Sequence, residues 1–278
     1  FVKFVPLGGW WDQVVLAQPV VIQTQKGLVR GIVGSKPPHL LEDEERNKVQ
    51  KLKSMFIDVG ARDEKEATSK FGIRPGDPIV PWSPFHRLSN RKLLAGKAFD
   101  DRVGVAMFVE ALKALKGKKH ANIVYGVGTV QEEVGLRGAQ TSAHAVEPDV
   151  ALVMEVAIAG DVPGIAEEES QVKLGKGPAI YLLEGSAIPN LRLRELALEI
   201  CAKKKIPYSV SLMPRGGTDA GRIHVHARGV PSLVIGAPTR HIHSHTGIMH
   251  SDDFDNAVKL IVELVKRLDA KTVAGLVA

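Results

Sequence analysis

An apolar run from Ile123 to Val130 ends in two adjacent carboxylates, Glu132 and Glu133, and glycines then interrupt the pattern at Gly135 and Gly138. A run of this length bounded by turn residues predicts a buried strand. In open α/β sheets, ligands bind at the carboxyl ends of the strands. Two neighbouring glutamates at such a point suit a divided task, in which one binds a metal ion and the other handles a proton. The alternative is a solvated acidic turn, because glutamate is common on protein surfaces.

Strands and helices alternate along the chain after Pro84. An amphipathic helix is expected after Asp101, with one apolar face formed by Val105, Phe108, Val109, Leu112 and Leu115. Further strands are expected at Val150–Glu155, Tyr208–Met213 and Ser232–Gly236, and further helices at Leu191–Ala202 and from about Asp252 to Leu268. This alternation predicts an α/β sandwich built on a mixed sheet over residues 85–278.

Residues 1–84 have a different pattern. The segments Val20–Thr24 and Leu28–Val33 flank a turn in which Gly27 supplies a positive φ, and this arrangement predicts a hairpin. Trp10 and Trp11 are adjacent, so in an extended segment they would face opposite sides. Short strands separated by turns predict a small β-rich domain here.

The composition excludes several classes of function. The chain has 278 residues, enough for one large domain or two smaller ones, and no apolar run has the roughly 20 residues that a membrane helix needs. The net charge is +6, but the lysines are scattered and aromatic residues make up only 5%, too few for a base-stacking surface. We therefore expect neither a membrane nor a nucleic-acid partner. The single cysteine, Cys201, excludes an internal disulfide and favours a reducing, cytoplasmic location. Sparse Gln and Asn beside plentiful Lys and Glu favour a thermophilic source.

Several polar residues lie at or just after the ends of apolar strands: Asp100, Glu132, Glu133, Glu155 and His243. Carboxylate and imidazole ligands together suit zinc or a similar divalent ion. A pair of ions would need a bridging carboxylate, which Asp100 could supply, and terminal ligands on each side. Glu133 and His243 could serve one ion and Glu155 the other, with Glu132 as the general base. Structural interpretations are also open: helix N-caps for Asp100 and its neighbour Asp101, a surface strand end for Glu155, and a solvated histidine-rich loop for His243.

Four segments of the sequence resemble one enzyme family, the tetrahedral aminopeptidases, which are di-metal exopeptidases of the glutamyl and deblocking aminopeptidase group. The resemblance covers essentially the whole chain. The segments that carry it are Lys97–Gly104, Gln131–Gly138, Gly217–Ala220 and Pro238–Ser244.

The resemblance implies a role for each candidate residue. Asp100 is implied as the bridging ligand, Glu132 as the general base, and Glu133, Glu155 and His243 as terminal ligands. Thr218, Asp219 and His241 are implied as substrate-binding residues. Two divalent ions are expected, zinc first and cobalt as the other candidate. The expected reaction is hydrolysis of the N-terminal peptide bond of a peptide substrate. The implied architecture is a catalytic domain at 85–278 carrying an inserted β-barrel-like dimerisation domain at 1–84, and the implied assembly is a tetrahedral homo-dodecamer built of dimers.

The sequence departs from the family pattern in two places. The position of Glu155 is usually Asp, although Glu can still ligate a metal. The family supplies another ligand from a His-X-Asp element, and none precedes Asp100; His250-Ser251-Asp252 has the spacing but follows the other motifs. We therefore expect the sequence to begin inside the protein. A related di-metal deacylase or deacetylase, or a non-catalytic assembly subunit, are the alternative functions.

The loop after Glu155 carries three consecutive acids, Glu167–Glu169. Loops at that edge of an α/β sheet line the site, so an acid there would favour substrates with a cationic N-terminal residue. A solvated acidic run is the alternative.

Overall fold

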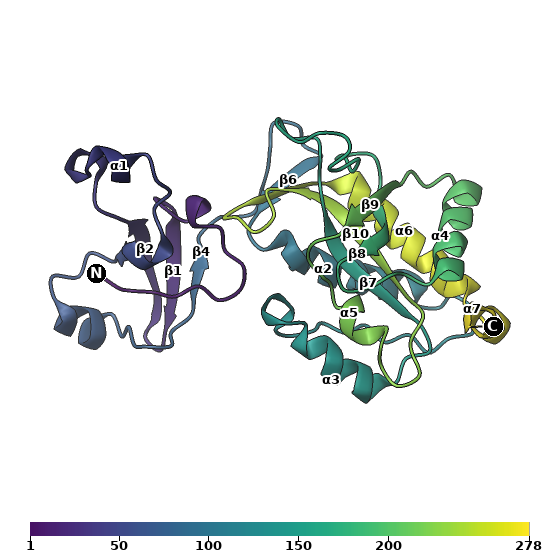
Figure 1. Ribbon diagram of the computed structural model, residues 1–278. Coiled ribbons are helices and arrows are strands. Elements are labelled where there is room, and N and C mark those ends of the chain that lie inside the picture. The colour runs from purple at the N-terminus through teal and green to yellow at the C-terminus, as the bar shows by residue number, and fades with distance from the viewer. Residues whose placement is uncertain (278) are drawn as a thin grey trace. The chain divides into compact units, whose positions relative to one another are not determined.

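The computed structural model describes residues 1–277, which form two compact units. The smaller unit comprises Phe1–Phe85 and the loop His243–Thr246, and the larger comprises His86–Ile242 and the chain from Gly247 onward. In Figure 1 the smaller unit is drawn mainly in purple and blue, and the larger begins in blue at β6 and runs through teal and green to yellow.

The smaller unit is built on an antiparallel sheet of four strands in the order β3-β2-β1-β4. The strands are β1 (Pro19–Thr24), β2 (Gly27–Gly34), β3 (Phe56–Asp58) and β4 (Ile79–Pro81). The expected hairpin is confirmed, because β1 pairs with β2 through a turn that ends at Gly27, whose φ is 120°. Within the described residues the sheet stays open, with β3 and β4 at its edges, rather than closing into a barrel.

Helical segments of the smaller unit are short. They are α1 (Asp43–Arg46), 3-10 turns at Asp12–Val14, Pro38–Leu40 and Leu52–Ser54, and one π-helical turn at Glu66–Lys70. One face of the sheet is covered by a core that includes Ile22, Ile57 and Met55. Trp10 packs against this core whereas Trp11 is 59% exposed. The two tryptophans therefore divide between core and surface, as their adjacency predicts.

The larger unit is built on a mixed sheet of seven strands. These are β5 (His86–Arg87), β6 (Leu93–Gly96), β7 (Ala151–Ile158), β8 (Ala179–Glu184), β9 (Ser209–Met213), β10 (Ser232–Arg240) and β11 (Gly247–His250). The main path runs β5-β6-β11-β10-β8-β9, and β7 pairs in parallel with β10. The pairs of β10 with β11 and of β6 with β11 are antiparallel, and β8 and β9 are parallel. The expected mixed-sheet α/β fold is confirmed.

Helices pack on both faces of this sheet (Figure 1). They are α2 (Phe99–Leu115), α3 (Arg137–Val146), α4 (Leu191–Lys204), α5 (Ala220–Ile223), α6 (Ser251–Arg267) and α7 (Ala270–Val277). Alternate residues of β10 point to opposite faces: Leu233 and Ile235 join the core under α2, α4 and α6, whereas Val234 joins the core beside α5. The middle of the strand, residues 233–237, carries no polar side chain, and this fits a strand that is covered on both sides.

Two details differ from the sequence expectations. The helix α2 is present, but its buried face is Val103, Met107, Ala111 and Leu115, while Val105 is 43% exposed. Gly104 explains the rotation, because a Cβ on Gly104 would lie 2.8 Å from the carbonyl oxygen of Met154 in β7. The helix therefore comes close to β7 at Gly104. Two valines of the expected apolar face, Val105 and Val109, are instead exposed to solvent.

The segment Ile123–Val130 is not a buried strand, so that prediction is wrong. It has no strand pairing among the described residues, and the side chains of Ile123, Tyr125 and Val130 are 83%, 62% and 68% exposed. Only part of the segment packs: Val124 contacts the main core, and Gly126 lies against Phe108 of α2. An apolar run becomes a strand only where a neighbouring strand takes its backbone hydrogen bonds.

Candidate metal centre

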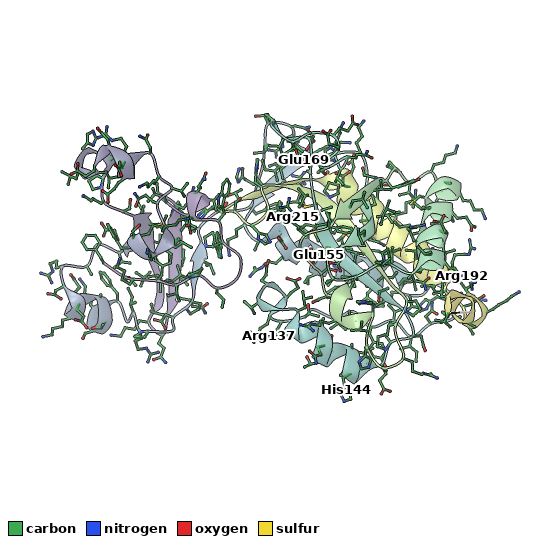
Figure 2. All side chains as sticks on the ribbon, in the orientation of Figure 1. Arg137, His144, Glu155, Glu169, Arg192 and Arg215 are labelled. Carbon is green, nitrogen blue, oxygen red and sulfur yellow. The ribbon has the colours of Figure 1, made fainter. Side chains whose placement is uncertain are left out.

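Glu155 lies within β7, facing Gly236 of β10 in the parallel register. Its side chain is only 8% exposed, and Figure 2 shows its label among the strands of the larger unit. The carboxylate accepts a hydrogen bond of 2.8 Å from the N–H of Val156. Burial raises the pKa of Glu155 well above its ordinary value, and the charges of Asp101 and Asp100 raise it further. The residue is a buried acid among like charges, not a surface strand end.

Asp100 and Asp101 stand at the entrance to α2, just beyond β6. Both have non-helical backbone angles, so the regular helix begins after them. Asp101 caps it, because its Oδ1 accepts a 2.9 Å hydrogen bond from the N–H of Gly104. A Cβ on Gly104 would lie 2.1 Å from Asp101 Oδ2, so the motif requires glycine there. The N-cap role therefore belongs to Asp101.

Glu132 and Glu133 form a tight 3-10 turn, Glu132–Val134. The turn closes through a 2.8 Å hydrogen bond from the N–H of Leu136 to the carbonyl of Glu132. Gly138 then donates to the carbonyl of Val130 at 2.9 Å, and a Cβ on Gly138 would lie 2.4 Å from that same oxygen. The last glycine of the motif thus lets the chain fold back closely enough to present the two acids together.

This turn brings Glu133 to Asp100, although the two are far apart in sequence. The carboxylates of Asp100 and Glu133 each offer an oxygen, and these oxygens lie within 4.8 Å of one another. Glu132 is also near, since its charge raises the pKa of both Asp101 and Glu155.

Asp219 adds a further carboxylate to this cluster. It precedes α5, and its Oδ2 accepts a 2.5 Å hydrogen bond from the hydroxyl of Thr129. Its Oδ1 is buried and has no hydrogen-bond partner among the described residues. Burial raises the pKa of Asp219, and the charge of Asp219 in turn raises the pKa of Asp101. Asp101 and Thr129 are not among the site residues predicted from the sequence, although the Asp100-Asp101 doublet is a signal that could have indicated Asp101.

Thr218 is only 2% exposed and lies beside the cluster as part of the framework. Its hydroxyl donates to Glu184 Oε1 at 3.4 Å and accepts from the N–H of Ala220 at 3.2 Å. Glu184, itself 2% exposed, also accepts from the hydroxyl of Ser186 at 3.0 Å. This buried network holds the loop that carries Asp219.

His241 and His243 follow β10 directly and are both exposed. Both have positive φ values, 60° and 54°. Ile242 belongs to the larger unit and His243 to the smaller, where its Nδ1 lies 2.9 Å from the carbonyl oxygen of Gly9. His243 therefore directly follows Ile242, the last residue of the first of the two segments that form the larger unit.

The donor set fits a divalent metal. The larger unit gathers Asp100, Asp101, Glu132, Glu133 and Glu155 around one point, and like charges raise the pKa of its buried members. Carboxylates in such a group need a compensating cation, which a divalent ion supplies. A cluster of acids of this kind on an α/β sheet is the arrangement that metal-dependent hydrolases use to hold their ions.

Comparison with known proteins identifies the family. Residues 1–260 match the M42 glutamyl aminopeptidase family, and the chain belongs to it. The chain is 36% identical over 275 residues to a lysyl aminopeptidase of Pyrococcus furiosus, covering 96% of this chain and 75% of the relative.

Two solved structures extend the comparison. A TET aminopeptidase from the marine sediment archaeon Thaumarchaeota archaeon SCGC AB-539-E09 has 54% sequence identity and a TM-score of 0.96, with 99% of this chain and 77% of that chain covered. The TET1 peptidase of Pyrococcus horikoshii, which can assemble into a tetrahedron or a large octahedral shell, has 31% identity and a TM-score of 0.83, with 96% and 77% covered. The expected family and peptidase activity are therefore confirmed: the chain is an aminopeptidase of a metal-dependent family. None of the helices among residues 1–277 is both long and apolar enough to cross a bilayer.

Proposed function

We propose that this aminopeptidase holds two divalent ions, with Asp100 as the bridging ligand, Glu133 and His243 serving one ion, and Glu155 serving the other. The observation that carries the proposal is that carboxylate oxygens of Asp100 and Glu133 lie within 4.8 Å of one another. The charge of Asp100 also raises the pKa of the buried Glu155, which is consistent with Glu155 belonging to the same group of ligands. The mixed carboxylate and imidazole set favours zinc, with cobalt as the second candidate.

Glu132 is the proposed general base. When bound, the ions polarise the scissile carbonyl and lower the pKa of water. Glu132 accepts a proton from the attacking water and delivers it to the leaving amine, so one carboxylate serves both halves of the hydrolysis. Its place beside Glu133 in a closed 3-10 turn supports this division of roles, because the turn holds both carboxylates at the same site.

Three further residues are proposed to handle the substrate. Asp219 has a buried oxygen that no group of residues 1–277 hydrogen-bonds, which suits a donor such as the free α-ammonium group of a peptide. Thr218 contributes by holding the loop of Asp219, because its buried hydroxyl is already bonded within the protein. His241 lies exposed after β10, where it can contact the rest of the peptide.

We extend the proposal to assembly. The outer face of the small sheet exposes apolar side chains: Leu28, Ile32, Val80 and Trp82 are 73%, 58%, 41% and 41% exposed, with the Arg30 guanidinium 4.4 Å from the centroid of the Trp82 ring. An exposed apolar face of this kind supports the role of the smaller unit, domain 1–84, in dimerisation. In this proposal six such dimers form a dodecamer, and the domain at 85–278 is the catalytic domain of each chain. The proposed location is the cytoplasm of a thermophilic organism.

The decisive experiment compares peptides with free and N-acetylated termini. The protein, depleted of metal by a chelator, is assayed before and after zinc or cobalt is restored. The proposal requires metal-dependent release of N-terminal residues from free peptides only. Preferential cleavage of acetylated substrates would instead establish the deacylase alternative, and no turnover with restored metal would favour an assembly subunit.

A further inference from the structure

The loop His243–Thr246 is held by the smaller unit, although β10 and β11 of the larger unit flank it. Thr246 and Ser83 are joined by a hydrogen bond between their hydroxyls. His245 is only 8% exposed and bonds to the backbone of Pro19. His243 has a left-handed φ of 54°, a conformation that a non-glycine residue keeps only where its surroundings determine it. The β-rich unit therefore determines the conformation of the loop that carries a proposed metal ligand.

The contact of His243 with Gly9 has a chemical consequence. A backbone carbonyl only accepts hydrogen bonds, so the 2.9 Å contact between Nδ1 and the carbonyl oxygen of Gly9 requires the hydrogen to be on Nδ1. In the neutral imidazole the lone pair then lies on Nε2. Histidines that bind metal commonly donate their other ring N–H to a carbonyl, which fixes both tautomer and ring orientation.

The local chain is shaped to present this carbonyl. Gly8 has a φ of 84°, and the N–H of Trp10 returns to the carbonyl of Gly8 at 3.2 Å, so the chain turns tightly around Gly9. Gly9 lies directly beside the ring: a Cβ there would make ordinary van der Waals contacts of 3.4 Å with Nδ1 and 3.6 Å with Cε1 of His243. Trp10 then anchors the turn in the core of the smaller unit.

We propose that Gly9 is a positioning residue for the metal centre, whose carbonyl selects the Nδ1–H tautomer of His243 and so presents Nε2 as the metal-binding atom. The inference rests on the proposed function for the ligand role of His243. The β-rich unit then has a second role besides assembly, because the conformation of its Gly8–Trp10 turn affects the affinity of His243 for the metal ion.

The first test needs neither metal nor substrate. The full-length chain is labelled with ¹⁵N-histidine, depleted of metal and studied by NMR at a pH where the imidazoles are neutral. The signals of His243 are assigned by their loss in His243→Gln. The expected result is the Nδ1–H tautomer for His243. A predominant Nε2–H tautomer in the wild-type protein overturns the inference.

The second test uses two matched glycine variants of the smaller unit. Gly8→Ala strains the turn that presents the carbonyl, whereas Gly60→Ala places the same strain, at a φ of 69°, with nothing within 4 Å of the added Cβ. Gly8→Ala is expected to shift His243 toward a mixture of tautomers and to weaken zinc binding by ~10–100-fold in competition with a chelator. Gly60→Ala should change neither.

Equal losses of zinc affinity in both variants would mean a general loss of structure and would overturn the positioning role. The tautomer and zinc measurements are independent of turnover. If they come out as expected in a protein without aminopeptidase activity, the proposed function fails while the positioning role of Gly9 stands.

Discussion

Replacing Glu132 by glutamine, and separately Glu133 by glutamine, should give two opposite patterns from adjacent residues. Glutamine keeps the volume and the hydrogen-bonding carbonyl of glutamate but cannot take a proton. Carboxylate oxygens of Glu133 and Asp100 lie within 4.8 Å of one another. The charge of Glu132 raises the pKa of two buried acids, Asp101 and Glu155. Glu132→Gln should therefore remove the general base without changing metal binding. Glu133→Gln should lower the affinity for the metal ions.

The magnitude follows from the role. Loss of a general base typically costs ~10²–10⁴ in rate, which is about 3–5 kcal/mol of barrier at ~1.4 kcal/mol per factor of ten. Metal binding should survive, because the charge of Glu132 is one of the causes that raise the pKa of Asp101 and Glu155. Removing that charge makes deprotonation of Glu155, a proposed ligand, easier.

The assay measures kcat and KM with an aminoacyl anilide and metal content by elemental mass spectrometry on the same samples. Glu132→Gln should be metal-replete with a greatly reduced kcat, while excess zinc should partly restore Glu133→Gln. A metal-replete Glu132→Gln protein that retains kcat within about tenfold of wild type would remove Glu132 from the role. Loss of metal from both variants to the same extent would show that the two acids are not divided between base and ligand.

Four further predictions concern stability, assembly and specificity. In the metal-free protein the raised pKa of Glu155 means that the folded state binds its proton more tightly than the unfolded state does, so thermal stability should fall as pH rises above the ordinary value of 4.5. Glu155→Gln should remove the contribution of Glu155 to that loss and raise the melting temperature at pH 8 by ~2–4 °C per kcal/mol of relief, and a lower melting temperature would contradict this. Gly177→Ala should lower the free energy of unfolding in denaturant by about 2–4 kcal/mol, because the φ of Gly177 is 90° and a Cβ would lie 1.9 Å from the Pro207 carbonyl oxygen. Gly164 has the same φ of 90° but open space around it, so Gly164→Ala should lower the free energy of unfolding by only about 1–2 kcal/mol. Light scattering should give a mass well above one chain, and a monomer at micromolar concentration would exclude the proposed dodecamer. For Glu167–Glu169, kcat/KM should favour Lys over Leu and Glu anilides with an advantage that shrinks as salt rises; a lead for Glu would eliminate the idea.

Local signals in the sequence were sufficient for much of this protein. The hairpin around Gly27, the buried face of α4 at Leu193, Leu196, Ala197 and Ile200, and the mixed α/β class all follow from periodicity and turn residues. These features depend on neighbours a few positions apart. The four motif segments also identified the family, because each places an uncommon combination of acids, glycines and histidines at a fixed spacing.

The tertiary structure alone decided the rest. Ile123–Val130 has the composition of a strand but no pairing strand among residues 1–277, and the close approach of α2 to β7 at Gly104 turns Val105 outward. Asp101 joins the acid cluster because the entrance to α2 packs against β7, and His243 is oriented by Gly9, far away in sequence. Each outcome depends on which segments meet in space. A residue's type determines what it can donate, accept or bury, but its neighbours across the fold determine its burial, its pKa and its hydrogen-bond partner.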